Sequence, residues 1–299
     1  MDETTNESTN EAAVEAAWRA HHKVLIDVAY RLLGSVSEAE DAVSEGFARL
    51  ARENVAAIDD VRGWLVVVVS RVCLDQLGSA RKRREAYVGT WLPEPVLTGD
   101  DADPAERITL DDSVRMALLV VLERMAPAER VAFVLHDVFQ YDFAEIAEIV
   151  GRSSAACRQL ASRGRRRVRA EPGAVFDVDP AREEAVARRF LAAAAGGDAE
   201  GLLRLLDPDV VLRADGGGLV VAPHRPVTGA EPIVKIIARG FRQYPGMSAV
   251  YGRLNGGPGM AVYDADGTLI TVAALTVRDG RIHAVDLIAN PEKLARLAS

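Results

Sequence analysis

The chain has few of the residues that mark disulfide-stabilised or metal-binding proteins. Only two cysteines, Cys73 and Cys157, occur among 299 residues, and they lie far apart in helical patterns. Their spacing fits neither a metal site nor a disulfide framework. Both are therefore predicted to be small core residues in a reducing compartment, and the sequence predicts no metal and no cofactor.

Long apolar runs and a targeting signal are also missing. The longest apolar runs, around Trp64–Val69 and Ala117–Leu122, are too short to span a bilayer. Residues 1–12 are acidic and polar, unlike a signal peptide, and are predicted to be disordered. These absences predict a cytoplasmic protein without a membrane partner.

Positive charge is in deficit over the chain as a whole. The formal net charge is −8, while 49% of the residues are apolar. A chain of this length and balance is expected to fold as a soluble globular protein with two or three domains. Its acidity argues against a general binder of polyanions, so any contact with nucleic acid must come from a local basic patch.

One such patch lies in residues 143–169, where the pattern predicts two helices around a tight turn. Gly151 is placed to end the first helix, and Ser153 is placed to cap the second. From Arg152 to Arg169 there are many arginines and no acidic residue. Small hydrogen-bonding residues ahead of cations suit a helix in the DNA major groove. An αα-hairpin with a solvated basic face is the alternative, and the turn glycine and the cap favour the helix-turn-helix.

The helical period separates two faces of the second of these helices. The face predicted to pack inward is small and apolar: Cys157, Leu160, Ala161, Gly164 and Val168. The residues predicted to contact DNA are Ser154, Ala155, Arg158, Gln159, Ser162, Arg163, Arg166 and Arg167.

Toward the N-terminus the pattern predicts helices over residues 13–33, 38–52 and 61–77. Ser37-Glu-Ala-Glu40 is typical of a capping box that opens the second helix. The same helix carries an acidic stripe, which taken alone fits plain solvent exposure. The third helix runs into the cations Arg81-Lys-Arg-Arg84, and both binding of phosphate and complementing the helix dipole would explain them.

The remainder of the chain alternates between linkers and ordered patterns. Residues 87–112 are rich in proline and acids and are predicted to be a linker, yet Trp91 and Leu92 are large apolar groups that need a docking surface. Further helices are predicted over residues 110–124 and 129–139. The C-terminal part is predicted to form an α+β domain with helices at 182–195 and 199–206 and strands at 209–213, 219–222, 260–263, 269–277 and 281–288.

Several motifs in this order resemble one known family. Ala39-Glu-Asp-Ala-Val-Ser-Glu-Gly-Phe47, Arg62-Gly-Trp-Leu65 and the cationic cluster resemble region 2 of extracytoplasmic-function (ECF) sigma factors, and the helix-turn-helix resembles their region 4. Trp91-Leu-Pro-Glu-Pro95, Asp215-Gly-Gly-Gly218 and Asn290-Pro-Glu-Lys-Leu294 are similar to the linker, pocket-loop and tail motifs of the sigma-J type, which carries a C-terminal SnoaL-like domain of the NTF2-like fold.

The resemblance implies a multidomain protein with two all-α sigma domains followed by an α+β, SnoaL-like cone. The expected division is region 2 at 12–86, a linker with the Trp-Leu-Pro-Glu-Pro motif at 87–112, region 4 at 113–170, a second linker at 171–179, and a SnoaL-like regulatory domain with a C-terminal tail at 180–299.

The resemblance also implies partners and roles for single residues. The partners are the RNA polymerase core, through its β′ clamp helices and β flap, and promoter DNA. The expected polymerase-binding residues are Glu38, Asp41, Glu45 and Phe47. The residues expected at the −10 element are Arg62, Trp64, Arg71, Arg81, Lys82, Arg83 and Arg84, although Trp64 fits the core equally well. The 152–166 helix would recognise the −35 element.

Motif residues in the linker and the C-terminal domain are expected to meet. The set is Trp91, Leu92, Pro93, Glu94, Pro95, Asp215, Asn290 and Lys293. Two positions depart from the family pattern, because Leu219 stands where lysine is common and Arg152 where an apolar residue is common.

Relatives of the SnoaL-like domain include cyclases and isomerases, so the C-terminal domain has a candidate pocket. Its candidates are Asp215, His224, His283 and Asp286. Strand alternation puts His283 and Asp286 on opposite faces, which counts against a His–Asp dyad from that strand. A regulatory domain is preferred to an enzyme, and a small molecule could still fill the pocket. Two alternatives remain open: a ligand-responsive one-component DNA-binding regulator, and a sigma factor fused to an active isomerase or cyclase.

Overall fold

The computed structural model describes residues 3–85, 87–98, 114–171 and 179–297, and these form two compact units. The first unit is Met1–Arg83 with Leu122–Arg167, and the second is Arg84–Val121 with Val168–Ser299. The predicted domain limits stay a prediction. Among the described residues, none of the helices combines the length and apolarity that a bilayer crossing needs.

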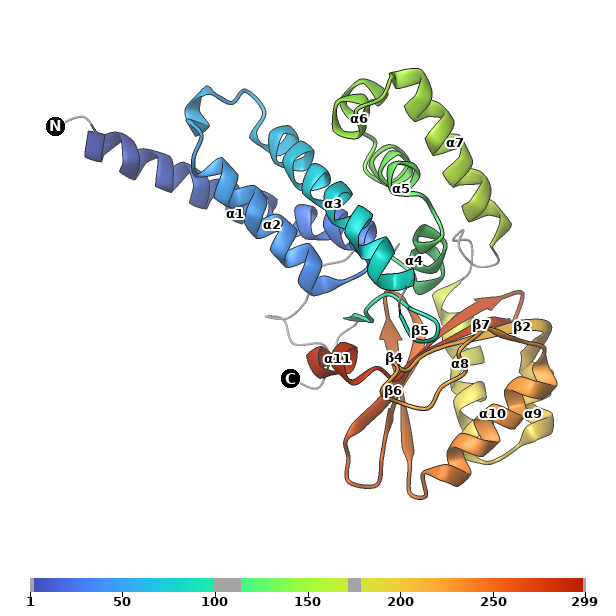
Figure 1. Ribbon diagram of the computed structural model, residues 1–299. Helices are drawn as coiled ribbons and strands as arrows, with labels where there is room; N and C mark the ends of the chain where they lie inside the picture. Colours follow the sequence, from blue (N-terminus) through green and yellow to red (C-terminus); the bar gives the residue numbers. More distant parts are fainter. Residues whose placement is uncertain (1–2, 86, 99–113, 172–178, 298–299) are drawn as a thin grey trace. The chain divides into compact units, whose positions relative to one another are not determined.

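The first unit begins with three helices: α1 (Glu3–Leu33), α2 (Val36–Leu50) and α3 (Val61–Glu85), with a 3-10 turn, η1 (Val55–Ala57), before α3 (Figure 1). The predicted disorder of residues 1–12 is wrong from Glu3 onward, where α1 starts. Asn10 explains part of this order, because its Oδ1 accepts from the Val55 N–H at 3.1 Å and its Nδ2 donates to the Glu53 carbonyl at 3.1 Å.

The predicted capping box at the start of α2 is also wrong. Ser35 is the N-cap, and its hydroxyl accepts from the Glu38 N–H at 3.3 Å. Gly34 ends α1 with a φ of 70°, so Ser35 is the one residue left between the two helices and takes the extended conformation that a cap needs. Ser37 lies within α2 and shares a hydrogen bond with the Ser35 hydroxyl.

The second part of the first unit holds the predicted helix-turn-helix. Helix α4 (Met116–Glu123) is shared between the units and is followed by α5 (Pro127–Phe133), the π-helical turn η2 (Val134–Val138), α6 (Phe143–Val150) and α7 (Ser154–Ala170). Gly151 has a φ of 68°, and the Ser153 hydroxyl accepts from the Ala156 N–H at 3.2 Å. The predicted turn and cap are thus confirmed, and the helix predicted over 129–139 is continued past α5 by a π-helical turn.

The apolar face of α7 packs inward as predicted. Cys157, Leu160, Ala161 and Val168 are buried. Gly164 lets the helix come close to α5, because a Cβ there would lie 2.8 Å from the Phe133 Cβ. Both cysteines are buried and free, which confirms the core prediction.

The second unit is built on a seven-stranded sheet of order β1-β4-β5-β6-β7-β2-β3. Its strands are β1 (Leu97–Thr98), β2 (Leu206–Asp215), β3 (Val227–Thr228), β4 (Ser248–Leu254), β5 (Gly257–Tyr263), β6 (Leu269–Arg278) and β7 (Arg281–Ile288). All pairings are antiparallel except that of β2 with β7. The α+β prediction is confirmed.

One face of the sheet carries three helices, α8 (Pro180–Ala195), α9 (Ala199–Leu205) and α10 (Ala230–Gln243), which lie together on one side (Figure 1). A large apolar cluster fills the space between them and the sheet. Helix α10 and strands β1, β3 and β4 were not predicted. The strand predicted over 219–222 is wrong, because the run of glycines Gly216–Gly218 turns the chain there.

The opposite face of the sheet, called the linker face below, is covered by other parts of the same unit. Leu92 of the linker, Met116 and Val120 of α4, and Leu294 of α11 (Pro291–Leu294) pack on apolar residues of β6 and β7. A 3-10 turn, η3 (Ala295–Leu297), follows α11. Alternation along β2 places Leu212 and Ala214 toward the helices and Arg213 and Asp215 on the linker face.

Candidate functional site

The exposed face of α7 is the candidate DNA interface. Ala155, Arg158, Gln159, Ser162, Arg163, Arg166 and Arg167 are exposed, and Ser154 is half-buried. Five of them surround an open hollow of about 360 Å³: Arg158, Gln159, Ser162, Arg163 and Arg166. The structure thus brings together on one surface the residues that the helical period had grouped.

The arginines of this helix divide into packed and open ones. Arg167 Nε donates to Glu129 of α5 at 2.8 Å, so its charge also stabilises the helix pair. The guanidinium of Arg158 lies 5.4 Å from the centre of the Phe143 ring. Arg163 and Arg166 are exposed on the hollow. The last two are therefore best placed to meet phosphate or base edges.

The candidate polymerase surface on α2 is acidic and partly exposed, and Phe47 is not part of it. Asp41 and Glu45 are exposed, Glu38 is half-buried, and Glu45 accepts from Arg49 Nε at 2.8 Å. Phe47 is only 5% exposed, and its ring centre lies 4.7 Å from that of Trp18. Its predicted role in polymerase binding is corrected to a core role, because burial leaves it no surface to offer.

The −10 candidates on α3 are not gathered into one described cluster. Arg62 is exposed and Trp64 is half-buried. Arg71 is exposed, and its Nη2 donates to the Glu148 carbonyl of α6 at 3.0 Å. The backbone of Arg81, Lys82, Arg83 and Arg84 lies in α3, but their side chains lie outside the described residues.

A second candidate site lies on the linker face around Asp215, at the end of β2. Asp215 is fully buried and accepts hydrogen bonds from the Tyr87 hydroxyl at 2.6 Å, the Leu92 N–H at 2.9 Å, the Gly217 N–H at 3.1 Å and Lys293 Nζ at 2.7 Å. Because two of these donors come from the linker and one from the tail, Asp215 joins three distant segments of the sequence.

Lys293 closes this arrangement from the tail. Its ammonium group also donates to the Leu92 carbonyl and lies 4.1 Å from the centre of the Trp91 ring. The residue is 8% exposed, so the Asp215–Lys293 ion pair is almost fully removed from water. We call the cluster of Tyr87, Leu92, Asp215, Asn290 and Lys293 the latch.

The tyrosine of the latch, Tyr87, is a hydrogen-bond donor. Burial raises the pKa of Tyr87, and the neighbouring Asp215 carboxylate raises the pKa further. The phenol therefore stays protonated, and its O–H donates a hydrogen bond to Asp215. Asn290 Nδ2 donates a hydrogen bond to the phenol oxygen at 3.0 Å.

The glycines after Asp215 make room for the tail and the linker. Gly217 has a φ of 66°, and a Cβ there would lie 2.6 Å from Cγ of Asn290. A Cβ on Gly218 would lie 3.1 Å from the Val88 Cβ. The glycine motif is therefore a packing requirement of the latch. The departure from the family pattern, Leu219, stands exposed beside it.

The linker beyond the latch continues along the sheet edge. Strand β1 pairs with β4, and the Val96 N–H donates to Asn255 Oδ1 at 3.2 Å. Within the motif, Leu92, Pro93 and Pro95 are buried, while Trp91 and Glu94 are half-buried. The predicted docking of Trp91 and Leu92 is thus observed, and their partners are residues of the C-terminal domain.

The four pocket candidates do not form one acid–base centre. Asp215 and Asp286 are both fully buried, but the first is paired with Lys293 and the second with Arg213. His283 is half-buried, with Nδ1 3.8 Å from Asp207 Oδ2, and His224 is exposed beside Gly89 of the linker. The carboxylates act here as ion-pair partners.

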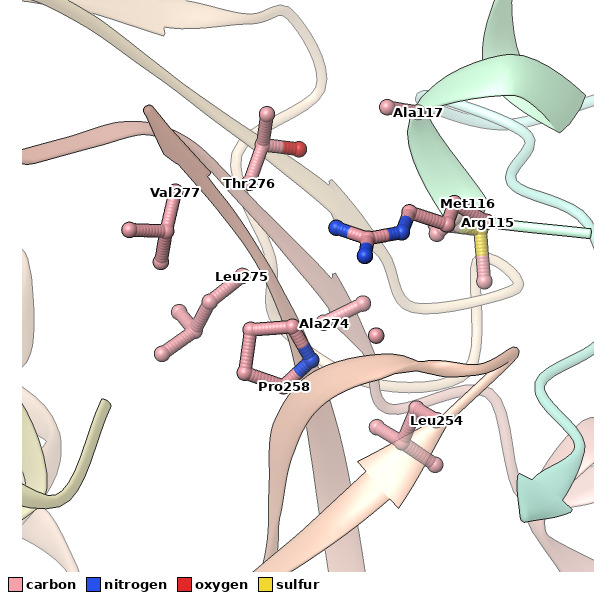
Figure 2. Close-up of a pocket in the computed structure, with 10 residues that line it drawn as sticks. Arg115, Met116, Ala117, Leu254, Pro258, Ala274, Leu275, Thr276 and Val277 are labelled. Atoms are coloured by element: carbon pink, nitrogen blue, oxygen red, sulfur yellow. The ribbon is translucent and has the colours of Figure 1, made fainter. Parts of the chain in front are cut away.

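The cavity drawn in Figure 2 does not include these candidates either. It lies between Arg115–Ala117 and residues of β4, β5 and β6, and its volume is about 10 Å³. Such a space holds one water molecule at most. In the part of the chain that the structure describes, no group of three His, Cys, Asp or Glu side chains is gathered as a metal would need.

Comparisons with known proteins agree with both sigma regions. The sigma-70 region 2 family matches residues 17–83, and the sigma-70 region 4 family matches residues 115–168. The chain is 46% identical over 282 residues to the ECF RNA polymerase sigma factor SigJ of Mycobacterium tuberculosis, which covers 90% of this chain and 89% of that protein. It is 41% identical over 283 residues to the probable ECF RNA polymerase sigma factor SigI of the same species, with 94% of each covered.

A crystal structure of the M. tuberculosis extracytoplasmic function sigma factor SigJ is similar over nearly the whole length. It matches with a TM-score of 0.77 and 40% identity, over 94% of this chain and 98% of that chain. The two regions define a protein of the sigma-70 class. The chain belongs to the ECF RNA polymerase sigma factors, and its similarity to SigJ includes the C-terminal α+β domain.

Proposed function

We propose that this chain directs core RNA polymerase to specific promoters and that its C-terminal domain gates this activity from within the same chain. Membership of the ECF sigma factors supports the first part. The exposed cationic face of α7 supports recognition of a promoter element by region 4. The proposal implies a cytoplasmic protein, because polymerase and chromosomal DNA are its partners.

The roles of the two regions follow from their surfaces. Asp41 and Glu45 on α2 present acidic groups for the β′ clamp helices, and the β flap would hold region 4. Arg163 and Arg166 face the −35 duplex, and Gln159, which precedes both on the same hollow, contacts base edges. Arg62 and the cluster 81–84 would neutralise phosphates at the −10 element.

The latch is the observation that carries the gating part. The linker joins region 2 to region 4, and the ion pair of Asp215 with Lys293 holds it on the C-terminal domain. A linker held in this way limits the arrangements that the two regions can take, and release of the latch would widen them. A buried ion pair suits such a switch, because each charged group interacts with its partner when the latch is closed and with water when the latch is open.

Run-off transcription with purified core polymerase tests both parts. The full chain should stimulate transcription from promoters that keep both elements and should pull down β′. A stop after Arg169 removes the domain, and a stop after Ile288 removes only the tail with Asn290 and Lys293. Both truncations should change promoter activity, by different amounts, and Trp91→Ala should reproduce part of one change. If both truncations transcribe like the full chain on several promoters, the domain is not a gate.

Two other functions fit the observations less well. A one-component regulator would bind duplex DNA tightly without polymerase, and it would have no use for the region 2 match. An active isomerase or cyclase needs an available general base, whereas Asp215 and Asp286 are each paired with a buried cation. We therefore propose that the C-terminal domain is regulatory and has no catalytic role.

A further inference from the structure

Two ion pairs within the second unit involve the residues that flank region 4 in the sequence. At its start, Arg115 donates to Glu183 of α8, whose carboxylate is almost fully buried. At its end, Glu171 directly follows α7 and accepts a hydrogen bond of 2.7 Å from Arg213 Nη2 on β2. The latch does not include either ion pair.

Arg213 is fixed in place by the neighbouring strand. It is paired in register with Asp286 of β7, and its Nη1 donates to Asp286 Oδ1 at 3.0 Å. Asp286 is fully buried and Arg213 is 4% exposed. Nη1 of the guanidinium thus binds Asp286 of the sheet, while Nη2 binds Glu171.

The same strand face holds the linker before region 4 and the residue after it. Arg213 and Asp215 are two residues apart on β2, so both side chains lie on the linker face, roughly 7 Å apart along the strand. Asp215 binds the linker, and Arg213 binds Glu171. Both connections of region 4 therefore meet on two neighbouring positions of one strand.

No flexible spacer separates Glu171 from the DNA-contacting face of α7. The helix is continuous from Ser154 to Ala170, and Arg166 lies five residues before Glu171, which is about 7 Å along the helix axis. The last turn of α7, from Val168, already belongs to the second unit. The Arg213–Glu171 pair therefore directly follows the end of this helix in the sequence.

We propose that Arg213 and Glu171 are positioning residues that fix the end of the recognition helix and so set which −10 to −35 spacing the protein accepts. This inference rests on the proposed assignment of α7 to the −35 element. A purely structural ion pair would change the stability of the chain but would leave the preferred spacing as it is.

The test uses the full-length chain with core polymerase and promoters that differ only in the length of the spacer between the two elements. Arg213→Ala would remove the cation that pairs with the buried Asp286 carboxylate and can fail to fold. Glu171→Gln is the informative variant, because Arg213 keeps Asp286. Glu171→Asp is the conservative partner. Glu200→Gln is the control, since it removes an exposed pair with Arg204 on α9, distant in sequence from region 4.

Glu171→Gln should lower the ratio of transcription at the best spacer to transcription at spacers one base pair longer or shorter, by about fivefold, the upper range for a partly exposed ion pair. Glu171→Asp should recover part of that ratio, and Glu200→Gln should leave it unchanged. The same ratio in Glu171→Gln and the parent chain would overturn the inference. Gln159→Ala, measured at constant spacer length, separates the two claims. If Gln159→Ala leaves the −35 sequence preference intact, the assignment of α7 to the −35 element fails. If Gln159→Ala changes that preference while Glu171→Gln leaves the spacing ratio unchanged, only the positioning role is rejected.

Discussion

Removing the charge of Lys293 is expected to cost far more stability than removing both charges of the latch. Lys293→Met leaves the Asp215 carboxylate fully buried without its cation. Breaking a buried pair from one side typically costs about 3–5 kcal/mol. The hydroxyl of Tyr87 and the N–H groups of Leu92 and Gly217 still donate to the carboxylate, so we expect a loss near the lower end, about 3 kcal/mol.

Adding Asp215→Asn to Lys293→Met removes the charge that was left behind. Replacing both members of a buried pair is often close to neutral, so the double variant should be more stable than Lys293→Met alone, by about 2 kcal/mol. Urea unfolding of the full-length chain, followed by circular dichroism, gives the free energy of unfolding of Lys293→Met, of Asp215→Asn and of the double variant. Lys235→Met on the exposed face of α10 is the control and should stay within about 0.5 kcal/mol of the parent.

A double variant that is no more stable than Lys293→Met would refute this reasoning, because the two charges would then act independently. Equal stability of Lys293→Met and the parent chain would show that the ion pair is not formed in solution.

Three further predictions concern single positions. Gly217→Ala should lose about 2–3 kcal/mol in the same unfolding assay, because the new Cβ meets the tail asparagine, whereas Gly267→Ala has open space at a φ of 82° and should lose only about 1–2 kcal/mol. Gln159→Ala should relax preference at one or two −35 bases, each worth about 1–3 kcal/mol of discrimination. Arg166→Ala should weaken binding to all sequences alike and flatten the slope of log affinity against log salt concentration by about one unit. Transcription or DNA binding by the holoenzyme over a salt series measures both effects. Phe47→Ala should lower the free energy of unfolding by about 3–5 kcal/mol, which a polymerase-contacting surface residue would not do.

Local signals in the sequence were sufficient for the helix-turn-helix. Gly151 and Ser153 act within a few residues of themselves, through a left-handed turn and a cap, and neither depends on the rest of the fold. The hairpin turn at Asp279 and Gly280 is of the same kind, with both residues at positive φ. Helix α10 contains Gly240, which weakens the helical signal, although the apolar side of the helix packs on the core of the second unit.

The latch shows where sequence reasoning stops. The motifs indicated that Trp91, Asp215 and Lys293 belong together, but Asp215 meets the backbone of Leu92 across 123 positions, and only the folded sheet brings them together. Phe47 shows the reverse error. Its motif suggested a surface role, while its helical position, on the face opposite the acidic stripe, already pointed to the core.

The central claim is that the latch controls transcription from within the chain. The most direct measurement is promoter-dependent run-off transcription by core polymerase with the parent chain, the Asp215→Asn and Lys293→Met double variant, and Lys235→Met, at equal concentrations of folded protein. We expect the double variant, which stays folded, to change transcript yield by about threefold or more, whereas Lys235→Met should not change it. Yields from the double variant that equal those of the parent on several promoters would contradict the central claim.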